Sequence, residues 1–271
     1  MKKNRNLIIN ICRIALAAAG VAGMLICGSH LERIEADFKT AENTTAILAE
    51  KYISAVEKEK TAEKAEETSS VVKDEKDGFP EIDFEGLDSE CTFGSVAGWL
   101  YCEGTNINYP IAQCDDNYYY LHRLLDGTEN YSGTLYTDYR CMENFRGTNT
   151  IVYGHNMANG TMFGELAKYI NDRDFYNEHP GMLLSTPDGD YSVEIFSAFV
   201  TVTSNEMLWK TEFSNDEEYE EYLEYIRSEN RIPEAAEAEV TVNDKIVSFI
   251  TCAYDTDHSR TVVYGKLNEI S

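Results

Sequence analysis

Short apolar segments separated by turn signals fill the chain from Phe79 to its end, and this texture constrains the fold most. Several segments alternate apolar and polar residues, as half-buried strands do. They are Val96–Tyr101, Gly133–Thr137, Thr150–Tyr153, Tyr191–Val202, Ile246–Cys252 and Thr261–Leu267. Asn-Gly at 159–160 and Asp-Gly at 188–189 indicate turns. One amphipathic helix, Asn215–Arg227, interrupts the strands, so the pattern predicts a β-barrel or sandwich with helical additions.

The N-terminus carries a membrane-targeting pattern. The basic residues Lys2, Lys3 and Arg5 precede a mostly apolar stretch from Leu7 to Gly28, which Asn10 and Arg13 interrupt. Its uninterrupted part, from Ile14, would span about 22 Å as a helix, whereas a bilayer core needs roughly 20 apolar residues. The whole stretch suffices if Arg13 extends back to the headgroups. Because basic residues stay inside, we expect 1–30 to be a signal anchor and the rest to be extracellular.

Two other fates of this segment remain open. Small residues between Ala17 and Gly23 would suit a cleaved signal peptide. A lipoprotein signal ending at Cys27 is disfavoured, because bulky Ile26 stands where a small residue is expected. All three interpretations export the remainder of the chain.

Residues 31–78 are predicted to be a helical stalk and linker. From Leu31 to about Glu66 there is no Pro or Gly, and apolar or small residues recur three and four positions apart. They are Leu31, Ile34, Phe38, Ala41, Thr45, Leu48, Tyr52 and Ala55. Packing on its own domain, or a solvated stalk, is favoured over a coiled-coil dimer because Thr45 and Ala55 weaken the seam. Thr68 to Gly78 is a polar linker, and 79–271 forms one compact domain.

Charge and cysteine content exclude several classes of protein. The formal net charge of −25 opposes nucleic-acid binding, which requires Lys and Arg against phosphates. The seven cysteines follow no zinc-ligand spacing, so we expect no metal. Five lie in the compact domain, and an odd number leaves at least one free thiol unless chains pair. Cys91, Cys102, Cys114 and Cys141 are expected to be small buried hydrophobes.

The apolar strand Ile246–Cys252 ends in a thiol, and a polar loop separates it from Arg260, which opens the next strand. Neighbouring strands would therefore bring Cys252 and Arg260 to facing ends. A thiol is a nucleophile as the thiolate, which a nearby cation favours. Arginine offers several donors to a carbonyl or an oxyanion. Taken alone, a buried cysteine and a surface arginine would be the commoner outcome.

A second strand, Thr150–Tyr153, ends in Gly154-His155. A histidine at a strand end can reach a thiol on a neighbouring strand and carry a proton to a leaving amine. His258 is a rival because it is closer to Cys252 in sequence, but it lies in a polar loop where many orientations are open. His122 and His179 have no cysteine nearby in sequence, and His30 lies at the membrane boundary.

The combination resembles the sortase family: Tyr-Gly-His-Asn-Met at 153–157, then Thr251-Cys252, a short polar loop, Arg260 and an apolar strand. The segments 97–100, 103–111, 116–121, 133–140 and 162–166 resemble class B sortases, and so does the position of the helix Asn215–Arg227. The resemblance covers Phe79 to Leu267. It departs at 248–251, Ser-Phe-Ile-Thr, where the family usually has Thr-Leu-x-Thr, and in the number of cysteines.

The resemblance implies a mostly β fold, an eight-stranded barrel with N-terminal helices and one long inserted helix. It implies a cysteine transpeptidase of the Gram-positive surface that needs no cofactor. Cys252 would attack a Thr carbonyl in the C-terminal sorting signal of a secreted protein, Arg260 would stabilise the oxyanion, and His155 would transfer protons. A peptidoglycan amine would resolve the acyl-enzyme. Asn117, Leu121, Thr251 and Ser259 are candidate substrate-binding residues, with ordinary barrel packing as the alternative.

The sequence can be compared with what other possible functions would require. A sortase that polymerises pilins would share the same residues. An L,D-transpeptidase would carry Ser-His-Gly-Cys-x-Arg, which is absent around Cys252. In a papain-like hydrolase the cysteine comes before the histidine, whereas here His155 precedes Cys252. An inactive, anchored scaffold protein would keep its function after Cys252→Ala.

Overall fold

The computed structural model describes residues 2–54, 81–253 and 258–270. The predicted polar linker at 68–78, the continuation of the stalk helix from 55 to 66, and positions 255–257 of the loop after Cys252 lie outside the described residues.

Eight strands close into a barrel in the order β10-β8-β7-β3-β4-β5-β6-β9. The strands are β3 Ser95–Tyr101, β4 Asn108–Gln113, β5 Leu135–Thr137, β6 Asn149–Tyr153, β7 Gly181–Thr186, β8 Gly189–Val202, β9 Lys245–Cys252 and β10 Ser259–Ile270. The pairs β4–β5 and β6–β9 are parallel, and the other neighbours are antiparallel. The predicted eight-stranded barrel is therefore confirmed.

Local sequence pattern predicted six of the eight barrel strands and missed two, β4 and β7. Strand β7 was not predicted, and β4 lay only within a segment of family resemblance. All but one residue of β4 is buried, and so are most residues of β7. Burial does not separate these two from β3 and β9, which are as continuously buried and were predicted. The turn at 188–189 is confirmed, because Thr186 and Gly189 pair at the end of the β7–β8 hairpin.

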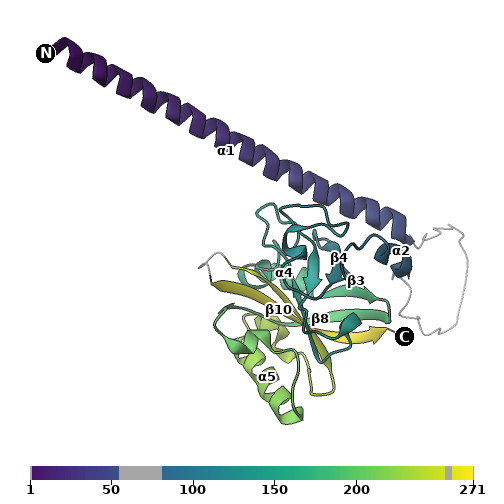
Figure 1. The fold of residues 1–271 in the computed structure, drawn as a ribbon. Coiled ribbons are helices and arrows are strands. Elements are labelled where there is room, and N and C mark those ends of the chain that lie inside the picture. The colour runs from purple at the N-terminus through teal and green to yellow at the C-terminus, as the bar shows by residue number, and fades with distance from the viewer. Residues whose placement is uncertain (1, 55–80, 254–257, 271) are drawn as a thin grey trace, which may run out of the picture.

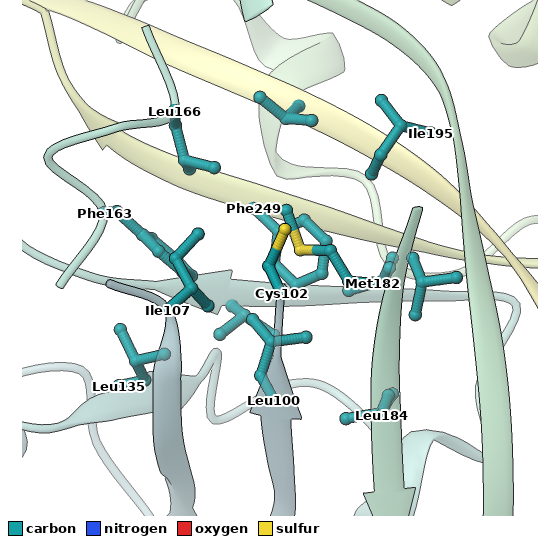
Figure 2. Packing of buried hydrophobic residues seen from close by; sticks show 14 of the residues in the cluster. Leu100, Cys102, Ile107, Leu135, Phe163, Leu166, Met182, Leu184, Ile195 and Phe249 are labelled. Carbon is teal, nitrogen blue, oxygen red and sulfur yellow. The ribbon is translucent and has the colours of Figure 1, made fainter. Parts of the chain in front are cut away.

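Apolar side chains fill the barrel interior, as Figure 2 shows. Leu100, Leu184 and Phe249 point into this core from strands β3, β7 and β9, and Phe163 joins them from the segment after His155. Each of these four side chains is fully buried. Burial of such a side chain stabilises the fold by about 1.5–3 kcal/mol, so the packed interior holds the strand ends at fixed positions.

The predicted inserted helix is α5, Asp216–Glu229, one or two residues from the expected bounds. Asn215 accepts a hydrogen bond from the Glu218 backbone N–H at 2.9 Å and caps the helix. Acidic residues fill its first turn, where they favour the helix dipole. Tyr222, Leu223 and Ile226 are fully buried on its inner face, in a second core outside the barrel. Figure 1 shows α5 on the side of the barrel away from α1.

Helix α1 runs from Lys2 to Tyr52 and projects away from the barrel at its N-terminal end (Figure 1). Its last turns pack on the domain, since Ala41, Leu48 and Tyr52 are buried. The C-terminal part of the heptad seam thus faces the chain's own domain, whereas Leu31 at its start is exposed. The predicted continuation of the helix beyond Tyr52 is wrong at 53–54, because these residues form strand β1, which pairs with β2, Glu81–Ile82. This pairing and a hydrogen bond from the Asp83 N–H to the Tyr52 carbonyl end the helix.

Within the described part of the chain, no helix combines the length and the apolar character needed to cross a membrane. The transmembrane anchor therefore stays a prediction.

Short helices connect the remaining elements. They are α2 Phe84–Asp88, α3 Lys168–Asn171, α4 Arg173–Glu178 and the 3₁₀ turns Tyr120–His122, Glu143–Phe145, Glu206–Trp209 and Pro233–Glu237. The sulfurs of Cys102, Cys114 and Cys141 are buried free thiols, as predicted, whereas Cys91 is half-buried.

Candidate active site

Three strand ends bring the predicted chemical groups together. Strands β6 and β9 run parallel, with Tyr153 opposite Ile250, and the Gly154 N–H donates to the Ile250 carbonyl at 3.2 Å. Both strands therefore end at the same rim, with His155 just beyond one and Cys252 closing the other. Strand β10 runs antiparallel to β9, and its Arg260 lies directly opposite Cys252. Residues paired in this way have Cα atoms about 4.5–5.5 Å apart.

A cavity of about 620 Å³ opens at this rim. It is lined by Asn117, Tyr118, Leu121, Tyr136, Asp138, Arg140, Tyr153, Gly154, His155, Thr203, Trp209, Ile250, Thr251, Cys252 and Arg260. The predicted catalytic residues and three predicted binding residues, Asn117, Leu121 and Thr251, thus share one cavity. Ser259 is buried and does not line it. His258 does not line it either, so the structure favours His155 over this rival.

Cys252 is the exposed end of an otherwise largely buried strand. Its backbone carbonyl accepts a hydrogen bond from Asn156 Nδ2 at 2.6 Å, which ties the cysteine to the residue after His155. The backbone of the strand end is therefore held while the thiol stays open to the cavity. An accessible thiol in a fixed position is what a nucleophilic cysteine requires.

The ring of His155 is held by one strong contact. Its Nε2 lies 2.7 Å from the carbonyl oxygen of Leu121. Because a carbonyl can only accept, Nε2 carries the hydrogen, and Nδ1 is the nitrogen left for proton exchange. Burial lowers the pKa of His155, although the bond to Leu121 opposes this shift. His155 is therefore mainly neutral at pH 7 in the unliganded protein.

The guanidinium of Arg260 is half-buried, and its Nη1 donates to the Ser259 carbonyl at 2.9 Å. Among the described residues, no carboxylate forms a salt bridge with it. Its other N–H donors face no competing protein anion in that part of the chain. A fork of donors opposite a thiol suits the oxygen of a carbonyl under attack.

One buried carboxylate, Asp138, lies at the same cavity with a cluster of hydrogen-bond donors around it, and the sequence analysis missed this cluster. Asp138 is fully buried, and its two oxygens accept from Arg140 Nε and Nη2, both at 2.8 Å. The Tyr153 hydroxyl donates to it at 2.7 Å, and Asn117 Nδ2 donates at 3.0 Å. Burial alone would raise the pKa of Asp138, but hydrogen bonds from Arg140 and Tyr153 outweigh burial and lower it.

The cavity residues that the sequence analysis missed differ in whether the sequence carried a signal for them. Asp138 and Arg140 stand two apart in the quoted segment 133–140, so a short Asp-x-Arg pattern was available as a signal. Thr203 and Trp209, from the connection after β8, also line the cavity and had no local signal. Within residues 20–53, 81–253 and 258–270, no group of three His, Cys, Asp or Glu side chains is placed to hold a metal ion.

These groups can supply a nucleophile, a proton carrier and an oxyanion donor at the rim of a β-barrel, a set that suits a cysteine acyl-transfer enzyme. Comparison with known proteins specifies the class. A family model described as the Sortase domain matches residues 100–268. Sortase B of Listeria monocytogenes is 36% identical over 174 residues, which cover 64% of this chain and 69% of that protein.

Further relatives agree. Sortase B of Staphylococcus aureus is 32% identical over 178 residues, covering 65% of this chain and 71% of the relative. The solved Staphylococcus aureus sortase B–substrate complex superposes with a TM-score of 0.64 at 31% identity, over 69% of this chain and 85% of that one. The chain therefore belongs to the sortase family of cysteine transpeptidases and resembles its class B members.

Proposed function

We propose that this chain is a class B sortase that cleaves a C-terminal sorting signal of secreted proteins at a Thr carbonyl and joins the protein to a peptidoglycan amine. The observation that carries the proposal is the strand register that sets Cys252 opposite Arg260, with His155 lining the same cavity. Family membership supports the reaction class. The structure of a relative with its substrate supports a sorting-signal peptide as the occupant of the cavity.

In the first half of the reaction, the Cys252 thiol gives its proton to neutral His155, and the resulting thiolate attacks the Thr carbonyl carbon so that an S–C bond forms. The carbonyl oxygen becomes an oxyanion, which Arg260 stabilises with N–H donors that no described carboxylate occupies. The C–N bond then breaks, and His155 in its protonated form gives a proton to the departing amine. The product is a thioester at Cys252.

In the second half, an acceptor amine attacks the thioester carbonyl and loses a proton to His155. The tetrahedral intermediate collapses, the S–C bond breaks and Cys252 leaves as the thiolate. A new amide remains, and return of this proton from His155 to the Cys252 thiolate restores the thiol and the neutral imidazole. Proton transfer through Nδ1 of His155 serves both halves, because Nε2 stays bonded to Leu121.

The candidate binding residues receive different roles. Asn117 and Leu121 line the cavity and are proposed to contact the peptide. The Thr251 hydroxyl is buried without a hydrogen-bond partner among the described residues, so it is proposed to donate to bound peptide. Ser259 lies off the cavity, and we assign it an indirect role, since its carbonyl holds Arg260.

Location outside the cytoplasm on a single membrane anchor is also part of the proposal. Lys2, Lys3 and Arg5 before the apolar stretch support it. On α1, exposed apolar side chains of Val21, Met24, Leu25 and Ile26 add to this support. An extracellular position would bring the enzyme to both of its substrates.

The test is cleavage of a library of fluorogenic sorting-motif peptides by the full chain in detergent micelles, with and without acceptor amines. Wild-type cleavage that Cys252→Ala, His155→Ala and Arg260→Ala all lose would support the proposal, and the preferred amine would separate wall anchoring from pilin polymerisation. Cleavage that survives Cys252→Ala would refute the mechanism. A folded wild type that cleaves no peptide would favour the inactive scaffold.

A further inference from the structure

Three aromatic rings meet at His155. The rings of His122 and His155 are stacked with centroids 5.2 Å apart, and Tyr131 lies nearly parallel to His155 at 6.2 Å. His122 and Tyr131 are themselves 6.3 Å apart. Because all three distances are short, each ring contacts both others, and two neighbours restrict the motion of the His155 ring.

Folding alone does not explain this cluster. Tyr131 is 50% exposed, and His122 is also exposed. Neither residue lines the cavity that contains Cys252. Side chains this exposed contribute little to the stability of a core. Their common feature is the catalytic histidine that both rings cover.

Helix α1 holds the loop that carries these rings. Asn130 is buried, and its Nδ2 donates to the Asp37 carbonyl of α1 at 2.8 Å. The ring of Phe38, the next residue of α1, lies 6.2 Å from that of Tyr131. Within the loop, the Asn130 N–H donates to the His122 carbonyl at 3.0 Å. A chain of contacts thus leads from α1 to the ring of His155.

We infer that Tyr131 and His122 are positioning residues for His155, and that α1, through Asp37 and Phe38, keeps them in place. The inference rests on the proposed function and deepens it. The rings limit rotation of the imidazole, so that Nε2 stays on the Leu121 carbonyl and Nδ1 stays available to the substrate. The helix that leads toward the N-terminus therefore acts on proton transfer indirectly, by keeping these rings in place.

Several titratable and charged groups surround His155. They are His122 and Tyr131 from the loop, Cys252 from β9, Arg260 from β10, the Asp138–Arg140 pair across the cavity, and Asp37 from α1 behind the loop. A charge on His122 repels protonated His155 and lowers its pKa further. Removing the ring of Tyr131 would admit water to the imidazole and raise this pKa, because burial is the main cause of its depression.

The experiment compares Tyr131→Ala and Tyr131→Phe in the full chain in micelles, measuring kcat, KM for the cleaved peptide and the histidine ring titration by NMR. Tyr131→Ala should lower kcat about tenfold with KM nearly unchanged, since misplacing a catalytic group slows chemistry more than binding. Its His155 titration should move to higher pH. Tyr131→Phe keeps the ring and should behave as wild type. Phe38→Ala should produce a smaller change in the same direction.

Tyr139→Ala is the matched control, because Tyr139 is 54% exposed and does not contact His155. A Tyr131→Ala protein that matches Tyr139→Ala in both kcat and His155 titration would overturn the inference. A Phe38→Ala protein with wild-type kcat and wild-type His155 titration would show that α1 plays no part in positioning His155. The titration needs no turnover, so it tests the ring cluster even if the wild type cleaves no peptide, an outcome that would refute the proposed function instead.

Discussion

Two arginines line the same cavity under different electrostatic conditions. Arg140 makes a bidentate ion pair with the fully buried Asp138. Arg260, opposite Cys252, has no carboxylate partner among the described residues and bonds only to a backbone carbonyl within them. An arginine whose charge a carboxylate already neutralises acts as part of the framework. An arginine with available donors can respond to negative charge that appears during a reaction.

The largest expected effect is at Arg260. Arg260→Ala should lower kcat/KM for peptide cleavage by roughly 10²–10³-fold, because loss of one oxyanion donor has this effect in other acyl-transfer enzymes. Arg260→Lys should recover only part of this loss, since an ammonium lacks the planar fork. Thermal melts of both variants should match the wild type. A full recovery by lysine would show that charge alone is needed.

Asp138 should matter for stability. Asp138→Asn leaves Arg140 without its anion and weakens the bonds from Tyr153 and Asn117, so we expect the free energy of unfolding to fall by about 2 kcal/mol. Urea denaturation at pH 7 measures the change. The matched control is Asp188→Asn, which removes the exposed pair with Arg146 and should change stability by less than about 1 kcal/mol. Equal losses in the two variants would contradict the framework role of the buried pair.

The stability difference between wild type and Asp138→Asn should depend on pH. The pKa of Asp138 is lowered in the folded protein despite its burial, because Arg140 and Tyr153 hydrogen-bond to the charged form. The carboxylate therefore stabilises the fold above the ordinary Asp pKa of about 3.9, and this contribution is lost as the pH falls through the lower folded value. Urea denaturation from pH 7 to pH 3 should show the two proteins converging below about pH 4. A gap that widens on acidification would reverse the assigned sign.

The smallest expected effect on activity is at Arg140. Arg140→Gln should keep kcat/KM within about threefold of the wild type, because its donors already serve Asp138 and not the substrate. Its stability should fall by about 1 kcal/mol, since the guanidinium is partly exposed. A loss as large as that of Arg260→Ala would erase the distinction between the two arginines and give both a part in catalysis.

Prediction from sequence was most successful for residues that lie at a strand end and whose side chains have a distinctive chemistry. Cys252 and His155 each lie where an apolar run stops, and Arg260 lies where the next one begins, so the run and the residue are visible together. Strand β7 was missed because Gly181–Thr186 holds only three consecutive apolar residues, too few to mark a buried strand. The sequence did not predict the end of α1 at Tyr52. The pairing of β1 with β2 terminates the helix there, and no residue of low helix propensity marks the position.

The Asp138 cluster shows the limit of local patterns. Its donors come from Asn117, Arg140 and Tyr153, which belong to three separate segments of the chain. Only the pairing of β5 with β6 brings Asp138 beside Tyr153. The ring cluster at His155 has the same origin, since His122 and Tyr131 belong to a separate loop, which packs against α1.

By itself the sequence determined the class of fold, the chemical groups and their position at strand ends, because hydrophobic alternation and side-chain chemistry are local properties. The tertiary structure decided which arginine is neutralised, which histidine shares a cavity with the thiol and which nitrogen of that histidine is available. These are matters of distance and burial between segments far apart in the chain. Closure of the barrel sets those distances, and no single segment encodes them.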